Sequence, residues 1–161
     1  MANVVPFSFK GELMSGTHNF ANGGDSFKTD LLKGTFNFDS SGGSTFKLAL
    51  YTNISGLTTA TTAFTATNEV STSGTNYTSG GNALTNNGVA VSSNIAFVDF
   101  ADLTFSSVSL SAVGALIYKS SSNEAVLVLD FGGTKTATNG DFVVQFPTAN
   151  SSSAIIRLGD A

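Results

Sequence analysis

Proton transfer and nucleophilic attack need a small set of side chains, and this sequence contains few of them. It has one histidine, His18, and no cysteine. A histidine-dependent triad would have to recruit His18, and thiolate nucleophiles and thiolate metal sites are excluded. His18 lies in a segment that recurs later in the chain with Phe36 at the equivalent position. Because histidine and phenylalanine interchange there, we expect His18 to pack rather than to transfer protons.

The remaining candidates for chemistry are carboxylates. Asp99 and Asp102 are three residues apart, and with Asp130 or Asp141 nearby they could bind calcium through oxygen atoms or form a glycosidase pair. No EF-hand spacing accompanies them, and Asp99–Asp102 is more simply a turn in which aspartate accepts local hydrogen bonds. We therefore predict no catalytic residue, no metal ligand, no cofactor and no enzymatic activity; calcium near Asp99 and Asp102 stays open.

Glycine pairs at 23–24, 42–43, 80–81 and 132–133 could suggest phosphate-binding loops. They lack the lysine pattern of such a loop, so they predict turns instead. The net charge of −4, with only seven basic residues, argues against a nucleic-acid partner, because a phosphate-binding face needs clustered lysine and arginine. No apolar run approaches the length of a membrane span, and no secretory signal pattern is visible at the N-terminus.

The surface predicted by this composition is hydroxyl, amide and glycine rather than ionic. Charged residues make up 11% of the 161 residues, against about 25% in an average globular domain. Such a surface loses little when charges are desolvated, which suits burial against other proteins. A low-charge extracellular-type β domain explains the composition equally well.

Short apolar runs between Gly, Ser, Asn and Thr clusters are typical of antiparallel strands joined by turns. The predicted strands are 45–52, 83–92, 95–100, 103–113, 114–118, 125–131, 142–146 and 154–158. In 103–113 the apolar positions change phase across Ser106 and Ser107, which predicts a β-bulge. The run Ala125–Phe131 is apolar on both faces and predicts a central core strand. Turns are predicted at 120–123 and 132–140.

A long segment, Asn53–Gly81, separates the first two predicted strands. It is dominated by Thr, Ser, Asn and Gly, and Glu69 is its only charged residue. Loops of this length in a compact domain are commonly functional or ordered by a partner. Its predicted apolar anchors are Phe64, Val70 and Tyr77.

The N-terminal part of the chain contains an internal repeat. The segment Phe9–Phe20 recurs as Phe27–Phe38, and each copy runs through a glycine pair to the next Phe-Lys. Two copies are too few for a solenoid. We interpret residues 1–44 as an extended arm or hairpin with a duplicated segment, and residues 45–161 as the body. The predicted fold is all-β, an antiparallel β-sandwich or jelly-roll-like domain.

Several motifs resemble a family of small tailed-bacteriophage virion proteins. They are Phe46–Thr52, Phe64–Val70, Tyr77–Thr85, Gly114–Tyr118, Val128–Phe131, Gly140–Phe142 and Phe146-Pro147. The likeness covers roughly residues 45–158, and its motifs are structural rather than catalytic. Family members usually carry one Phe-Lys…Gly-x-His-Asn-Phe segment before the first strand, whereas this chain carries two copies.

The resemblance implies a virion structural protein, most plausibly a capsid decoration (cement) protein that forms homotrimers on the capsid surface and binds the major capsid protein. Buried aromatic residues dominate interface energies, so the expected contact residues are aromatic: Phe7, Phe9, Phe20, Phe27, Phe36, Phe38, Phe64 and Tyr77. The alternative for the arm residues is that they complete the domain's own core. The alternative function is a phage tail or fibre module that binds host-surface glycans, stacking sugars on an exposed Tyr77 or Tyr118.

Overall fold

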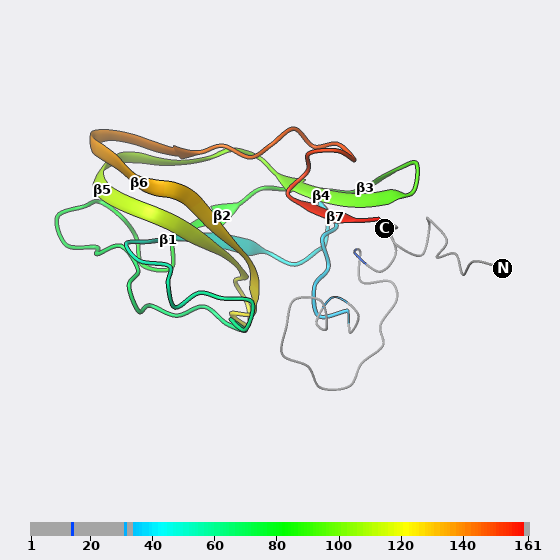
Figure 1. Ribbon diagram of the computed structural model, residues 1–161, viewed down its shortest axis with the longest axis horizontal. Helices are drawn as coiled ribbons and strands as arrows, with labels where there is room; N and C mark the ends of the chain where they lie inside the picture. Colours follow the sequence, from blue (N-terminus) through cyan, green and yellow to red (C-terminus); the bar gives the residue numbers. More distant parts are fainter. Residues whose placement is uncertain (1–13, 15–30, 32–33, 160–161) are drawn as a thin grey trace. The chain divides into compact units, whose positions relative to one another are not determined.

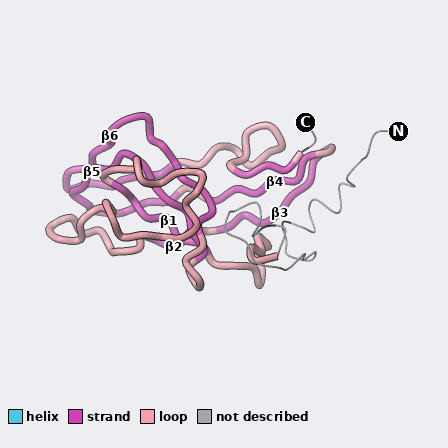
Figure 2. Tube along the Cα trace, turned by 60° about the horizontal axis from the view of Figure 1, so that its bottom comes forward, coloured by secondary structure: helices cyan, strands magenta, loops and turns pink. Residues whose placement is uncertain are grey.

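The computed structural model describes Met14, Leu31 and residues 34–159. In this part of the chain seven β-strands form two antiparallel sheets (Figure 1). Figure 2 shows the described chain as strands connected by loops. The prediction of an all-β protein is therefore confirmed. The sandwich or jelly-roll arrangement and the N-terminal arm remain predictions.

The larger sheet has the strand order β2-β1-β5-β6. Its strands are β1 (Phe46–Tyr51), β2 (Asn82–Leu84), β5 (Leu103–Lys119) and β6 (Ala125–Val144). The smaller sheet has the order β3-β4-β7. Its strands are β3 (Asn86–Ser92), β4 (Ile95–Phe100) and β7 (Ile156–Leu158).

The described chain divides into two compact units. Residues 45–84 and 102–145 form the unit with the larger sheet. Residues 34–44, 85–101 and 146–159 belong to the unit with the smaller sheet. One boundary between the units falls at Ser44 and Thr45, where the sequence divides into an expected arm and body, but parts of the expected body contribute to both units.

Strand β5 shows how the phase change in the sequence becomes structure. It is a single strand across both predicted runs, 103–113 and 114–118. Its pairing with β6 shifts register between Phe105 and Val108, and Ser107 has a φ of 55°. The predicted β-bulge is confirmed: it keeps Phe105, Val108 and Leu110 on the buried side although the apolar positions change from odd to even numbers.

The prediction that Ala125–Phe131 forms a central core strand is wrong. β6 is the edge strand of its sheet, and Leu127, Leu129 and Phe131 are only half-buried. The two-sided core strand is β5, in which 114–118 is buried on both faces. Apolar content on both faces did not distinguish a strand at the edge from one in the middle, because that depends on which strands pair.

The prediction that the chain reverses direction at 132–140 is also wrong. β6 continues through these residues, and after an interruption of the pairing at 131–134 it pairs with β5 again, as Ala112 with Lys135 and Leu110 with Ala137 show. Gly132 and Gly133 adopt a positive-φ conformation, with φ values of 67° and 136°, but this conformation lies within the strand. It produces an outward excursion of β6 instead of a new strand. The turn at 120–123 does reverse the chain between β5 and β6.

Two smaller corrections concern strand ends. The predicted strand 83–92 is divided at Thr85 into β2 and β3, which belong to different sheets. The predicted strand 154–158 is shortened to β7. β1 and β4 agree closely with their predicted ranges, because strict alternation marks β1 and an apolar run interrupted only by Asp99 marks β4.

Candidate functional site

The long segment Asn53–Gly81 is fastened to the larger sheet by backbone hydrogen bonds. β2 covers only Phe46–Leu48 of β1. Beyond it, Val70 N donates to Leu50 O at 2.9 Å and Thr52 N donates to Asn68 O at 2.9 Å. The loop therefore continues the edge that β2 leaves uncovered, so its own chain orders it.

The same segment is fastened a second time where β6 begins. Phe64 N donates to Asn123 O at 2.8 Å, and Ala125 N donates to Thr62 O at 2.9 Å. Ile54, Leu57 and Phe64 pack on a buried cluster that includes Ala49, Tyr51, Leu116 and Tyr118. The predicted anchors are confirmed, because Val70 and Tyr77 are buried and Phe64 is half-buried.

Glu69, the only charged residue of the loop, is the centre of a polar network. Its Oε1 accepts hydrogen bonds from the Tyr77 hydroxyl at 2.8 Å and from Gly80 N at 2.6 Å. Its Oε2 accepts one from the Ser79 hydroxyl at 3.1 Å. Hydrogen bonds to a carboxylate are roughly twice as strong as neutral ones, so this side chain ties the two halves of the loop together.

All three tyrosines of the chain take part in holding this loop. Tyr77 accepts a hydrogen bond from Leu50 N at 3.0 Å, Tyr51 donates to Thr65 O at 2.5 Å, and Tyr118 donates to Gly80 O at 2.8 Å. The ring of Phe64 stacks on Tyr118 with 4.7 Å between centroids. We call Tyr51, Glu69, Tyr77 and Tyr118 the tyrosine–glutamate network.

Burial raises the pKa of each tyrosine in this network, and the nearby Glu69 carboxylate adds to the shift. The pKa of Tyr51 rises from its ordinary value of 10.0 to about 12. Burial likewise raises the pKa of Tyr77 and of Tyr118. The hydroxyls therefore stay protonated well above neutral pH, and they act as hydrogen-bond donors rather than as acids or bases.

A steep loss of stability at alkaline pH follows from these shifts. An unfolded tyrosine ionises near pH 10, whereas the folded ones still keep their protons, so the unfolded state binds fewer protons above pH 10 and is favoured as pH rises. The contribution of these tyrosines to stability should begin to fall near pH 10. The loss is up to about 1.4 kcal/mol per pH unit for a tyrosine that is ionised in the unfolded state and protonated in the folded state, and for Tyr51 it extends to about pH 12.

Denaturant unfolding between pH 8 and pH 12, with tyrosinate absorbance recorded in parallel, checks this expectation. In the folded protein the absorbance should rise only as the chain unfolds. Reversible ionisation of all three tyrosines near pH 10 in the folded state would contradict it.

The predicted contact residues differ in how deeply they are buried. Phe36 and Phe38 are fully buried, with their ring centroids 6.0 Å apart, so these two complete the chain's own core. Tyr77 is 4% exposed and belongs to the tyrosine–glutamate network. Phe64 is half-buried against Tyr118. Four predicted contact residues lie outside the described residues, as does His18: Phe7, Phe9, Phe20 and Phe27.

The carboxylates do not form the cluster considered from the sequence. Asp99 lies within β4, is 1% exposed, and accepts a hydrogen bond from Phe100 N at 2.9 Å. The interpretation of Asp99–Asp102 as a turn is therefore wrong for Asp99, and Asp102 belongs to the other compact unit. Within the described part of the chain, no group of three or more acidic, histidine or cysteine side chains is placed to hold a metal ion.

The tyrosines proposed for stacking on sugars are not available for it. Tyr118 and Tyr77 are each 4% exposed, and their hydroxyls are used inside the protein. The expectation of an exposed aromatic platform at these two positions is wrong. The loop covers Tyr118, and Tyr77 is itself a loop residue that is buried in the core.

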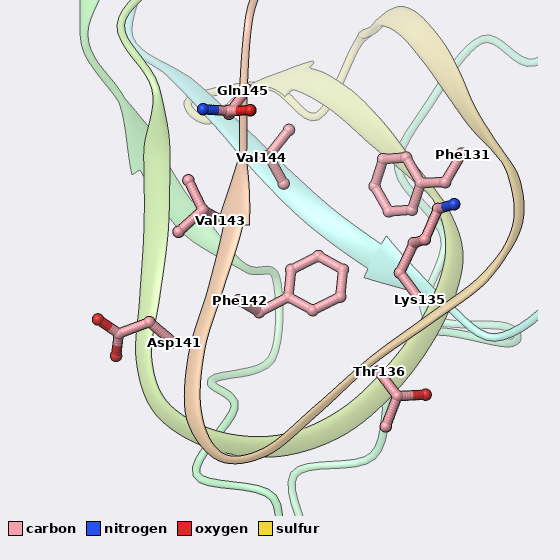
Figure 3. Close-up of a pocket in the computed structure, with 8 residues that line it drawn as sticks. All are labelled: Phe131, Lys135, Thr136, Asp141, Phe142, Val143, Val144 and Gln145. Atoms are coloured by element: carbon pink, nitrogen blue, oxygen red, sulfur yellow. The ribbon is translucent and has the colours of Figure 1, made fainter.

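A cavity on the inner side of the bend in β6 was not predicted. Its volume is about 410 Å³ (Figure 3). Its apolar lining consists of Phe131, Phe142, Val143 and Val144, and its polar lining of Lys135, Thr136, Asp141 and Gln145. Phe131 and Phe142 have their ring centroids 6.0 Å apart. The one signal in the sequence is the pair Gly132 and Gly133, whose positive φ values let β6 leave its partner and bend.

Comparison with known proteins identifies no relative of this chain. No family model, no curated protein and no solved structure matches it. Among the described residues, no helix is long and apolar enough to span a membrane.

Proposed function

We propose that this protein is a bacteriophage capsid decoration (cement) protein. It binds the outer surface of the head as a homotrimer, contacts the major capsid protein, and stabilises the shell through protein–protein contacts without catalysing a reaction.

The observation that supports this proposal most is where the family-like motifs meet in space. Phe46–Thr52, Phe64–Val70, Tyr77–Thr85 and Gly114–Tyr118 are separated along the sequence. Each of them contributes at least one residue to the tyrosine–glutamate network, and the network holds the long loop on the sheet. Four of the seven motifs that carry the resemblance therefore share one structural task, which is to hold the loop on the sheet.

The described surface of β5 and β6 also suits burial against another protein. Ser111 and Thr136 form a hydroxyl pair at 2.7 Å across the two strands, and Ser109 donates to Asn139 Oδ1 at 3.0 Å. All four side chains are uncharged; Ser111, Thr136 and Asn139 are exposed, and Ser109 is half-buried. Desolvating neutral hydroxyl and amide groups costs much less than desolvating charges, so a partner can cover such a surface without ion pairing.

Heads that lack the protein provide the test. Adding the purified protein should saturate at a copy number close to the number of three-fold positions of the shell, and it should raise the temperature at which the particles break. Cryo-electron microscopy of the saturated particles locates the added density, and a heat-release assay of packaged DNA measures the stabilisation. A few copies per virion, or density on the tail, would reject the proposal.

A further inference from the structure

The core of the larger sheet is left incompletely covered at β6. Leu48 and Leu50 of β1 are fully buried. Leu129 and Phe131 of β6 are only half-buried. The apolar face that begins at β1 thus reaches the surface at the edge strand, and the cavity bounded by Phe131 and Phe142 lies there.

The outer edge of β6 is paired over a short stretch. Among the described residues, backbone bonds at this edge join 62–64 to 123–125, and no other strand follows β6 in the sheet order. An edge strand of 20 residues is a template for a further strand. Val143, at 49% exposure, is one of two large hydrophobic side chains that are exposed in the described chain.

We propose that this cavity, hereafter the β6 socket, receives Phe7 or Phe9 from the N-terminal segment of a second copy of this chain, which lies along the edge of β6. The proposal deepens the homotrimer of the proposed function and rests on it. Each subunit then supplies one socket and one inserting segment, and a head-to-tail contact of this kind forms a closed trimer when each step rotates by one third of a turn.

The N-terminal segment has the chemistry that the socket selects. In Val5–Phe9 the apolar side chains alternate with Pro6 and Ser8, so Val5, Phe7 and Phe9 share one face when the segment is paired as a strand. The socket offers the rings of Phe131 and Phe142, and Lys135 is placed to contact the face of an added ring. Its volume, about 410 Å³, exceeds what one aromatic side chain needs.

The N-terminal segment is anchored in the described structure at Met14. Met14 is fully buried, and its carbonyl accepts a hydrogen bond from Phe38 N at 3.0 Å, in the compact unit that does not contain the socket. Phe9 is five positions before Met14 in the sequence, and Phe7 is seven positions before it. At about 3.5 Å per residue these rings reach roughly 17–25 Å from this tether, which sets the distance within which the socket of a second copy must lie.

A photo-crosslinking experiment on the full chain tests the proposal. The photoreactive residue p-benzoylphenylalanine replaces Phe9, and equal amounts of isotopically light and heavy protein are mixed, denatured, refolded together and irradiated. Mass spectrometry of the cross-linked peptides is expected to find light–heavy pairs that join position 9 to residues 131–145. Cross-links to other regions, or pairs formed only within one chain, would overturn the proposal.

Substitutions give a second, independent readout. Phe131→Ala and the double change Phe7→Ser/Phe9→Ser should each raise the dissociation constant of the oligomer at least tenfold in sedimentation equilibrium. Combining them should add little, because both remove the same contact. Val91→Ser is the matched control, since Val91 is 46% exposed but does not line the socket. Unchanged assembly in both test variants would overturn the proposal.

The experiments distinguish a failure of the socket proposal from a failure of the proposed function. If the cross-links map elsewhere while the protein still saturates phage heads, only the socket is wrong. If Phe7 or Phe9 and the β6 socket assemble the oligomer but the oligomer does not bind heads, the proposed cement function is wrong and the proposed self-association is supported.

Discussion

Replacing Gly81 with alanine should lower the free energy of unfolding by about 3 kcal/mol. Gly81 has a φ of 70°, and an added Cβ atom would lie 1.8 Å from Leu48 O and 2.8 Å from Ala49 Cα. Both contacts are with backbone atoms of β1, so no side chain can rotate away to make room. The β1 backbone must move, and the pairing of β1 with β2 is disturbed.

Gly74→Ala is the matched control for this change. Gly74 has nearly the same φ, 71°, but an added Cβ would meet nothing within 4 Å. It should therefore cost only the conformational strain, about 1 kcal/mol. Urea denaturation followed by circular dichroism measures both variants. Equal losses for the two would show that the close approach of Gly81 to β1 contributes nothing beyond strain.

Replacing Tyr77 with phenylalanine should lower the free energy of unfolding by about 3 kcal/mol. The ring would keep its packing on Phe105, whose centroid is 5.7 Å away. The change removes the acceptor of Leu50 N and one donor to Glu69. A buried donor without an acceptor and a carboxylate with one partner fewer both raise the energy of the folded state, and the loop should loosen first.

Tyr118→Phe is the comparison for this second change, because it removes a single hydrogen bond, to Gly80 O. It should cost about 1 kcal/mol. Glu69→Gln, alone and combined with Tyr77→Phe, completes a double-mutant cycle in which we expect a coupling of about 1–2 kcal/mol. Hydrogen exchange then reports whether protection is lost at Val70 and Gly81. Independent effects of the two substitutions would show that Tyr77 and Glu69 do not act as a unit.

These two expectations bear on the proposed function through the loop. A cement protein must present a fixed surface, because each contact that has to be ordered on binding subtracts from affinity. The tyrosine–glutamate network and the close approach of Gly81 order the loop before any partner arrives. A loosened loop in Tyr77→Phe should therefore weaken binding to heads more than Gly74→Ala does, at a temperature where both proteins remain folded.

The sequence by itself determined the features that depend on neighbouring residues. Alternation identified β1, an apolar run identified β4, and the change of phase in β5 located the bulge near Ser107. The glycine pairs at 42–43 and 80–81 located turns, and Phe64, Val70 and Tyr77 were recognised as anchors of the loop. Each of these rests on the period of a strand or on the conformational freedom of glycine, and both act over a few residues.

Only the tertiary structure decided which strands pair and what their side chains face. The sequence shows that Ala125–Phe131 is apolar, but its place at the sheet edge depends on the absence of a further strand beside it in the described chain. It shows one carboxylate in a polar loop, but Glu69 meets Tyr77 and Gly80 because the loop folds back on β1. The β6 socket likewise arises from a bend that brings Phe131 close to Phe142. Such contacts join residues that are not neighbours in the sequence, so a pattern defined over a few consecutive residues cannot predict them.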